Sequence, residues 1–151
     1  MIHVKPATND QIAEIFDNNI FDGANAMIAT DTETGEVVGY SKFSIINGVF
    51  TIYDVSPAEK DIWLCDLISR ATMNYAVNRG ILLCNLDKAA PKRAFLLLRY
   101  IDNEQIDCIN IIQLFTMCKN CSHRRPRPET NAATSRDIRV FERSSSLGLW
   151  I

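Results

Sequence analysis

The stretch from Val49 to Asp87, VFTIYDVSPAEKDIWLCDLISRATMNYAVNRGILLCNLD, decides the fold of this chain. It contains an apolar strand up to Pro57, a helix that ends at Gly80 and a second apolar strand. Pro57 cannot donate to a sheet ladder, and Gly80 with Arg79 before it is typical of a helix end. The stretch therefore predicts a β-α-β unit.

Alternation and helical spacing predict which faces of this unit are buried. Alternation along the first strand places one set of side chains on one face, namely Phe50, Ile52 and Asp54, and the other set opposite, namely Thr51, Tyr53 and Val55. The helix repeats apolar residues at spacings that put them on one side, namely Leu64, Ile68, Ala71 and Tyr75. Because a lone unit cannot bury that side, we expect it to lie on a larger sheet.

The flanking segments extend the unit on both sides. Before it, the sequence predicts a strand over 2–7, a helix over 10–19, strands over 26–30 and 37–46, and a tight hairpin at Asn47-Gly48. After it, the sequence predicts a helix from Pro91, with an apolar face of Ala94, Leu97, Leu98 and Ile101, and a strand region over 104–117. The order is β-α-β-β-β-α-β-α-β, which indicates a mixed α+β fold with a mostly antiparallel sheet flanked by helices.

Composition and charge narrow the class of protein. With 47% hydrophobic and 23% charged residues, the 151-residue chain has the composition of an ordinary globular protein. No apolar run approaches the length of a membrane span, and the first ten residues do not look like a signal peptide. The net charge of -2 gives no general reason to expect nucleic acid. Five cysteines, mostly in apolar segments, favour reduced thiols and a cytoplasmic location.

The charge is divided unevenly along the chain. All six basic residues after position 121 are arginines, in a stretch without apolar periodicity. This shift predicts a folded domain over residues 1–121 and an arginine-rich, disordered tail over residues 122–151. The tail contains no aromatic residues interleaved with its arginines around 123–130, so contact with RNA or an acidic partner is the minor interpretation.

The element order and the segment YDVSPAEKDIWLCDLISRATMNYAVNRGI resemble the GNAT superfamily of acyl-CoA-dependent N-acetyltransferases over residues 2–117. In that family, a strand ending in Val-x-Pro leads to a loop and a helix start that hold the pyrophosphate of acetyl-CoA. The resemblance implies four coenzyme-binding positions here, namely Val55, Lys60, Trp63 and Cys65. The family has small residues where this chain has Trp63 and Cys65, and we expect the indole to fill the cleft.

The resemblance also implies catalytic positions. A base next to the acceptor falls on Asp54, with Glu59 and Tyr53 as the other polar groups nearby. The tyrosine that serves the family as general acid falls on Leu98, and Tyr100 is the nearest tyrosine. We therefore expect a GNAT-fold protein that transfers an acetyl group to a small amine or a peptide N-terminus with impaired or atypical coenzyme binding, or an inactive binding or regulatory module of the same fold. A homodimer is left open.

A third hypothesis comes from the cysteines. Cys118 and Cys121 form a C-x-x-C motif with His123 two residues further on, a spacing that can bind zinc or exchange disulfides. A structural zinc site needs a fourth ligand, which the sequence does not supply nearby. The prediction is therefore no metal, with incidental cysteines.

Overall fold

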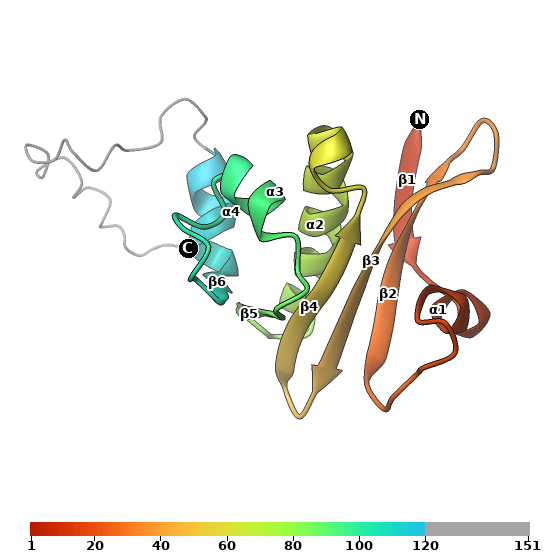
Figure 1. Ribbon diagram of the computed structural model, residues 1–151, viewed down its shortest axis with the longest axis horizontal. Helices are drawn as coiled ribbons and strands as arrows, with labels where there is room; N and C mark the ends of the chain where they lie inside the picture. The colour runs from red at the N-terminus through yellow and green to blue at the C-terminus, as the bar shows by residue number, and fades with distance from the viewer. Residues whose placement is uncertain (120–151) are drawn as a thin grey trace, which may run out of the picture. The chain divides into compact units, whose positions relative to one another are not determined.

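The computed structural model describes residues 1–119, of which residues 1–114 form one compact unit. The sheet has six strands, which lie side by side in the order of the sequence. Figure 1 shows their arrangement. The strands are β1 (Ile2–Pro6), β2 (Ala24–Asp31), β3 (Val37–Ile46), β4 (Val49–Ser56), β5 (Leu83–Leu86) and β6 (Cys108–Asn110). The helices are α1 (Asn9–Ile15), the short 3-10 helix η1 (Glu59–Asp61), α2 (Ile62–Val77), α3 (Lys92–Leu97) and α4 (Ile111–Lys119).

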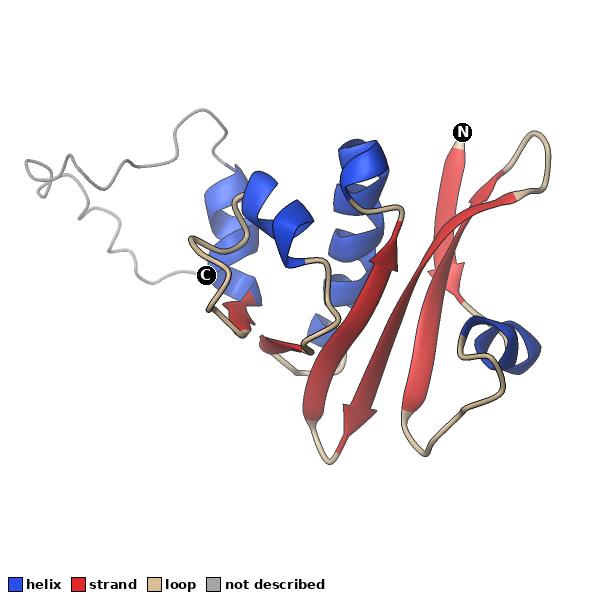
Figure 2. Ribbon diagram, viewed as in Figure 1, coloured by secondary structure: helices blue, strands red, loops and turns tan. Residues whose placement is uncertain are grey.

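Neighbouring strands are antiparallel except for β4 and β5, which are parallel. The parallel pair is joined by α2, as the β-α-β prediction required. The predicted arrangement is confirmed: a mixed α+β fold with a mostly antiparallel sheet and helices on its faces (Figure 2).

Local signals account for the element ends. Asn47 and Gly48 both have positive φ, 51° and 79°, in the tight turn between β3 and β4. Gly80, with φ 82°, follows α2, and the Arg79 guanidinium donates to the Tyr75 carbonyl at 3.0 Å. These features confirm the predicted hairpin and the predicted end of the helix.

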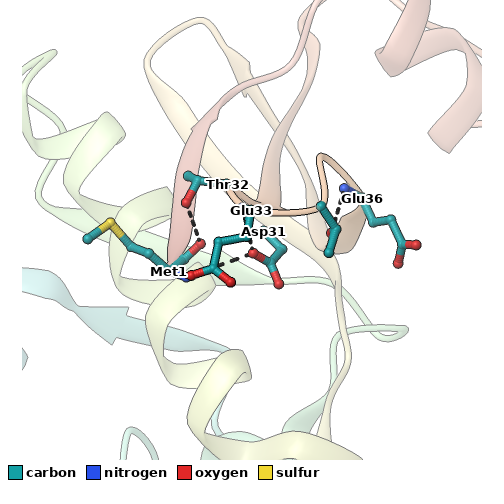
Figure 3. Close-up of polar contacts among 6 residues, drawn as sticks. Met1, Asp31, Thr32, Glu33 and Glu36 are labelled. Carbon is teal, nitrogen blue, oxygen red and sulfur yellow. Dashed lines mark hydrogen bonds and ion pairs between the residues drawn. The ribbon is translucent and has the colours of Figure 1, made fainter.

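The turn between β2 and β3 is tied to the start of β1 by polar contacts (Figure 3). The Thr32 hydroxyl and backbone N–H both donate to the Met1 carbonyl, at 3.2 and 2.8 Å. The Met1 ammonium lies 3.8 Å from an Asp31 carboxylate oxygen. The Asp31 carboxylate also accepts from the Glu33 N–H at 2.9 Å, so one side chain orders both segments.

The helices α1 and α2 cover opposite faces of the sheet. Side chains of β3 alternate, so Ser41 faces α2, where its hydroxyl lies 2.7 Å from the Thr72 hydroxyl. Lys42 points to the other face, and its ammonium lies 5.3 Å from the centroid of Phe16, just after α1. The main core lies between α2 and the sheet, around Phe43, Phe50, Ile52, Ile68 and Met73.

The buried side of α2 differs from the predicted one. Of the predicted apolar face, only Ile68 is fully buried, and the other buried positions are Cys65, Ser69, Thr72, Met73 and Ala76. Small polar residues lie in the contact because Thr72 donates to the Ile68 carbonyl at 2.8 Å while it meets Ser41. Hydrophobic periodicity does not count such satisfied hydroxyls, so the prediction was wrong about the face.

Two predictions in the last third of the domain were also wrong. The strand expected over 104–117 is confined to β6, and a helix begins at Ile111 because the Asn110 side chain caps it, accepting from the Gln113 N–H at 3.0 Å. The apolar face predicted after Pro91 is confirmed at Ala94 and Ile101, which are buried, but it was wrong at Leu97, which is 66% exposed. Phe95 is the other buried residue of α3. The predicted tail, residues 122–151, lies outside the described residues.

Candidate functional site

A β-bulge in β4 rearranges the residues that were predicted as the site. Phe43 of β3 pairs with Ile52, but the next residue back, Lys42, pairs with Asp54, so Tyr53 is an extra residue in β4. The buried positions of β4 are consequently 50, 52 and 55. The predicted alternation was wrong beyond Ile52: Val55 faces α2, and Asp54 lies on the α1 face.

The strands β4 and β5 separate at the same point. Their pairing ends at Ile52 and Leu86, and the Asp87 N–H donates to the Ile52 carbonyl at 3.0 Å. Beyond Ile52, β4 continues to Ser56. The segment after β5 turns away from β4 and leads to α3 (Figure 1). Carboxyl ends of parallel strands that separate in this way are a usual place for ligand binding in α/β sheets.

Polar side chains gather beside the bulge on the α1 face. Tyr40 pairs with Ser56 across β3 and β4, one step beyond the Lys42–Asp54 pair. Burial raises the pKa of Tyr40, and the negative charges of Asp54 and Asp17 raise it further, while a hydrogen bond from Ser56 opposes them. Two carboxylates therefore make the potential at the Tyr40 hydroxyl negative.

Three aromatic rings line the same face. Phe16 packs edge-on against Phe21 with ring centroids 5.8 Å apart, and Phe21 packs edge-on against Tyr53 at the same separation. The Tyr53 hydroxyl lies 2.8 Å from the Ser44 hydroxyl, which holds the ring in place. Carboxylates beside aromatic faces are a combination suited to an ammonium group.

The start of α2 is occupied by a side chain of the protein itself. The Asp61 carboxylate accepts a hydrogen bond from the Leu64 N–H at 3.1 Å and caps the helix. Lys60, in η1, is exposed. Trp63 is 77% exposed, so the expectation that its indole packs into a cleft was wrong. The helix start is filled by a carboxylate and not by the ring.

The other predicted coenzyme-binding side chains belong to the core. Val55 is 1% exposed and Cys65 is 0% exposed. Burial raises the pKa of Cys65 to about 11, and its thiol lies 3.9 Å from the Ser69 hydroxyl. These two side chains thus point away from any ligand at the helix start.

Tyr100 makes its contacts with Phe95 of α3 and Asp66 of α2. It is 8% exposed, stacks on Phe95 with centroids 5.2 Å apart, and donates its hydroxyl hydrogen to Asp66 in α2. Burial is the main cause that raises the pKa of Tyr100, and Asp66 adds to it. Asp66 also binds Arg70 at 2.9 Å. The structure therefore gives Tyr100 a partner in α2 and does not bring it together with Asp54.

Sequence reasoning did not find Tyr40, Lys42 or Asp17. Tyr40 and Lys42 reach Asp54 only through the β3–β4 register, and Asp17 acts on the cluster from the end of α1. No local pattern links these residues. The Asn47-Gly48 hairpin predicts that β3 and β4 pair, but counting from it places Lys42 opposite Tyr53, because the count does not include the bulge.

No protein-family model matches the chain, and no curated protein matches it. The chain is similar in structure to an acetyltransferase of the GNAT family from Desulfovibrio desulfuricans, at 13% identity and TM-score 0.48 over 65% of this chain and 83% of that one. A GNAT-family acetyltransferase from Staphylococcus aureus gives 11% identity and TM-score 0.47 over 68% and 82%. An acyl-CoA N-acyltransferase from Klebsiella pneumoniae gives 15% identity and TM-score 0.45 over 87% and 92%.

Residues 1–119 contain neither a cluster of metal ligands nor a helix that could span a membrane. Within that range no three His, Cys, Asp or Glu side chains come together as a metal site. The predicted C-x-x-C motif extends beyond it, since Cys121 and His123 lie outside the described residues. None of the helices in the same range is long and apolar enough to span a membrane.

Proposed function

We propose that this chain is a GNAT-like module that binds a small amine or a peptide N-terminus and does not carry out ordinary acetyl-CoA-dependent transfer. The carrying observation is the bulge at Tyr53, which turns Asp54 onto the α1 face beside Tyr40. The other half of the proposal rests on the Asp61 carboxylate at the start of α2.

The amine side has the charge and the surfaces that an ammonium needs. Asp54 is half-buried, and one of its carboxylate oxygens accepts from the Val55 N–H at 2.9 Å, which fixes its orientation. Asp17 adds negative charge at Tyr40, and the rings of Phe21 and Tyr53 supply apolar faces further along β3, where the Tyr53 hydroxyl meets Ser44. An ammonium there would gain from both the carboxylates and the rings.

The residues at the start of α2 do not fit the pyrophosphate of a coenzyme. Backbone N–H groups at a helix start bind phosphates when they are free, but the Leu64 N–H already donates to Asp61. A carboxylate about 4 Å from a phosphate charge costs on the order of 1 kcal/mol in water and more when water is excluded. Trp63, the residue before Leu64, carries a large side chain. Glycine is favoured at a position where a phosphate must come close to the backbone.

The test is a calorimetric titration of spermidine into the wild-type protein and into Asp54→Asn. The substitution keeps the shape of the side chain and removes its charge, so we expect affinity for spermidine to fall about tenfold, or 1.4 kcal/mol. Asp102→Asn is the matched control, because Asp102 is exposed and lies away from the bulge. Equal affinity in the wild type and Asp54→Asn would overturn the proposal.

The second candidate is an acyl-CoA-dependent N-acyltransferase with atypical coenzyme binding and Asp54 as its base. The observation that favours it is the place of Asp54, on the strand that separates from β5 two residues earlier. An enzyme of this kind must release free thiol from acetyl-CoA in the presence of an amine. A panel of polyamines, aminoglycosides and peptide N-termini decides between the two candidates, since turnover with any of them would favour the enzyme.

A further inference from the structure

Lys42 places an ammonium group of the protein on the surface that the proposed ligand would use. Its partner across the β3–β4 ladder is Asp54, and residues directly opposite in an antiparallel pair have Cβ atoms about 5 Å apart. Its ammonium lies 5.3 Å from the centroid of Phe16, which is itself 8% exposed. Lys42 therefore crosses the α1 face between the candidate carboxylate and the aromatic rings.

Lys42 is held there weakly. In the range that the structure describes, no carboxylate oxygen forms an ion pair with the Lys42 ammonium, which lies over the Phe16 ring. An ammonium over an aromatic ring is held by its attraction to the ring quadrupole, which is weaker than a hydrogen-bonded ion pair. The four-carbon side chain has enough freedom to leave without moving the strand.

We propose that Lys42 is a resident competitor of the ligand amine: its ammonium occupies the cation position on the α1 face, and a ligand binds when Lys42 swings out. This inference rests on the proposed function and adds a residue that sets its affinity. It predicts selectivity for ligands whose charge exceeds that of one lysine side chain, such as polyamines, because the ligand must replace an ammonium already in place.

The first test compares the affinity of spermidine for variants of Lys42. Lys42→Met keeps an apolar side chain of similar reach without the ammonium, and we expect it to bind spermidine about tenfold more tightly than the wild type. Lys42→Arg keeps the charge and should bind like the wild type. Lys88→Met is the matched control for a lost positive charge, because Lys88 is exposed in the loop after β5.

The second test follows Lys42 itself by NMR. Protons that lie over an aromatic ring resonate upfield, so the ε-methylene of Lys42 should be shifted upfield in the free protein and return toward its usual position as spermidine saturates. Spermidine binding with the Lys42 resonance unchanged, or Lys42→Met binding no more tightly, would overturn the inference while leaving the proposed function intact. If neither the wild type nor Lys42→Met binds, both fall. If only Lys42→Met binds, the inference stands and the proposed function of the wild type falls.

Discussion

The Tyr100 hydroxyl donates to the Asp66 carboxylate. This bond joins the segment that follows α3 to the first turns of α2. Arg70 completes the group, with its guanidinium 2.9 Å from the same carboxylate and 5.7 Å from the Tyr100 ring. A second, exposed contact also joins the two segments, since Arg93 of α3 lies 3.6 Å from Glu59 of η1. The buried contact is the one that should matter for stability.

Tyr100→Phe should lower the free energy of unfolding by about 1.5–3 kcal/mol, because it removes a buried hydrogen bond to a charged group. Tyr53→Phe is the matched control: its hydroxyl meets the neutral Ser44 hydroxyl at 2.8 Å, so its loss should be about 0.5–1.5 kcal/mol. Urea unfolding measures both. Equal losses in the two variants would show that the bond to Asp66 is no stronger than one to a neutral hydroxyl, and no loss in Tyr100→Phe would show that Tyr100 acts by packing alone.

Cys65 should make stability depend on pH at the alkaline end. Its pKa is raised from 9.0 to about 11 by burial, so the folded protein holds the thiol proton in a range where the unfolded chain has lost it. Stability therefore falls as the pH rises from 9.0 to about 11. Urea unfolding across that window should show a steeper fall in the wild type than in Cys65→Ala. If the free energy of unfolding fell equally with pH in the wild type and in Cys65→Ala, the Cys65 thiol would not be the cause.

Asp61→Ala should cost about 1 kcal/mol of stability, within the range of 0.5–2 kcal/mol for the loss of a helix cap. Asp61→Asn can still accept from the Leu64 N–H, so it should change stability by only a few tenths of a kcal/mol. Lys60→Ala, next to it in η1 and exposed, serves as the control and should be neutral. A neutral Asp61→Ala would mean that the cap contributes nothing.

Gly39→Ala tests the close approach of α2 to the sheet. A Cβ at Gly39 would lie 2.6 Å from both Ile68 Cδ1 and the Ser56 carbonyl oxygen. The Ile68 side chain can move, but the carbonyl belongs to β4, so we expect a loss of about 1–3 kcal/mol. Val37→Ala, on the same strand and 55% exposed, is the control. Thermal unfolding distinguishes them, and a stable Gly39→Ala would contradict the packing described.

The parts of the fold that follow from local chemistry could be predicted from the sequence. The positive-φ turn at Asn47-Gly48 and the helix end at Gly80 are properties of those residues, and they fix the strand order. The bulge could not be predicted, because no glycine or proline near Tyr53 marks it. The extra residue is recognised only when the pairing of β4 with β3 is known. That single insertion turns Asp54 to the α1 face.

The candidate site was predictable only in part for the same reason. Asp54 was a candidate through the resemblance, which places a base on this strand, but its neighbours Tyr40 and Lys42 come from register across two strands. The exposure of Trp63 was missed because a large apolar ring at a helix start suggests packing, whereas the cap already formed by Asp61 leaves the ring outside. Side-chain competition for one helix start is not visible in spacing alone.

Titration calorimetry of acetyl-CoA into the wild-type protein asks whether the start of α2 still binds the coenzyme. With the Leu64 N–H held by Asp61, we expect no saturable heat at millimolar coenzyme, in a sample that gives a saturable isotherm with spermidine. A saturable acetyl-CoA isotherm with a micromolar dissociation constant would contradict it.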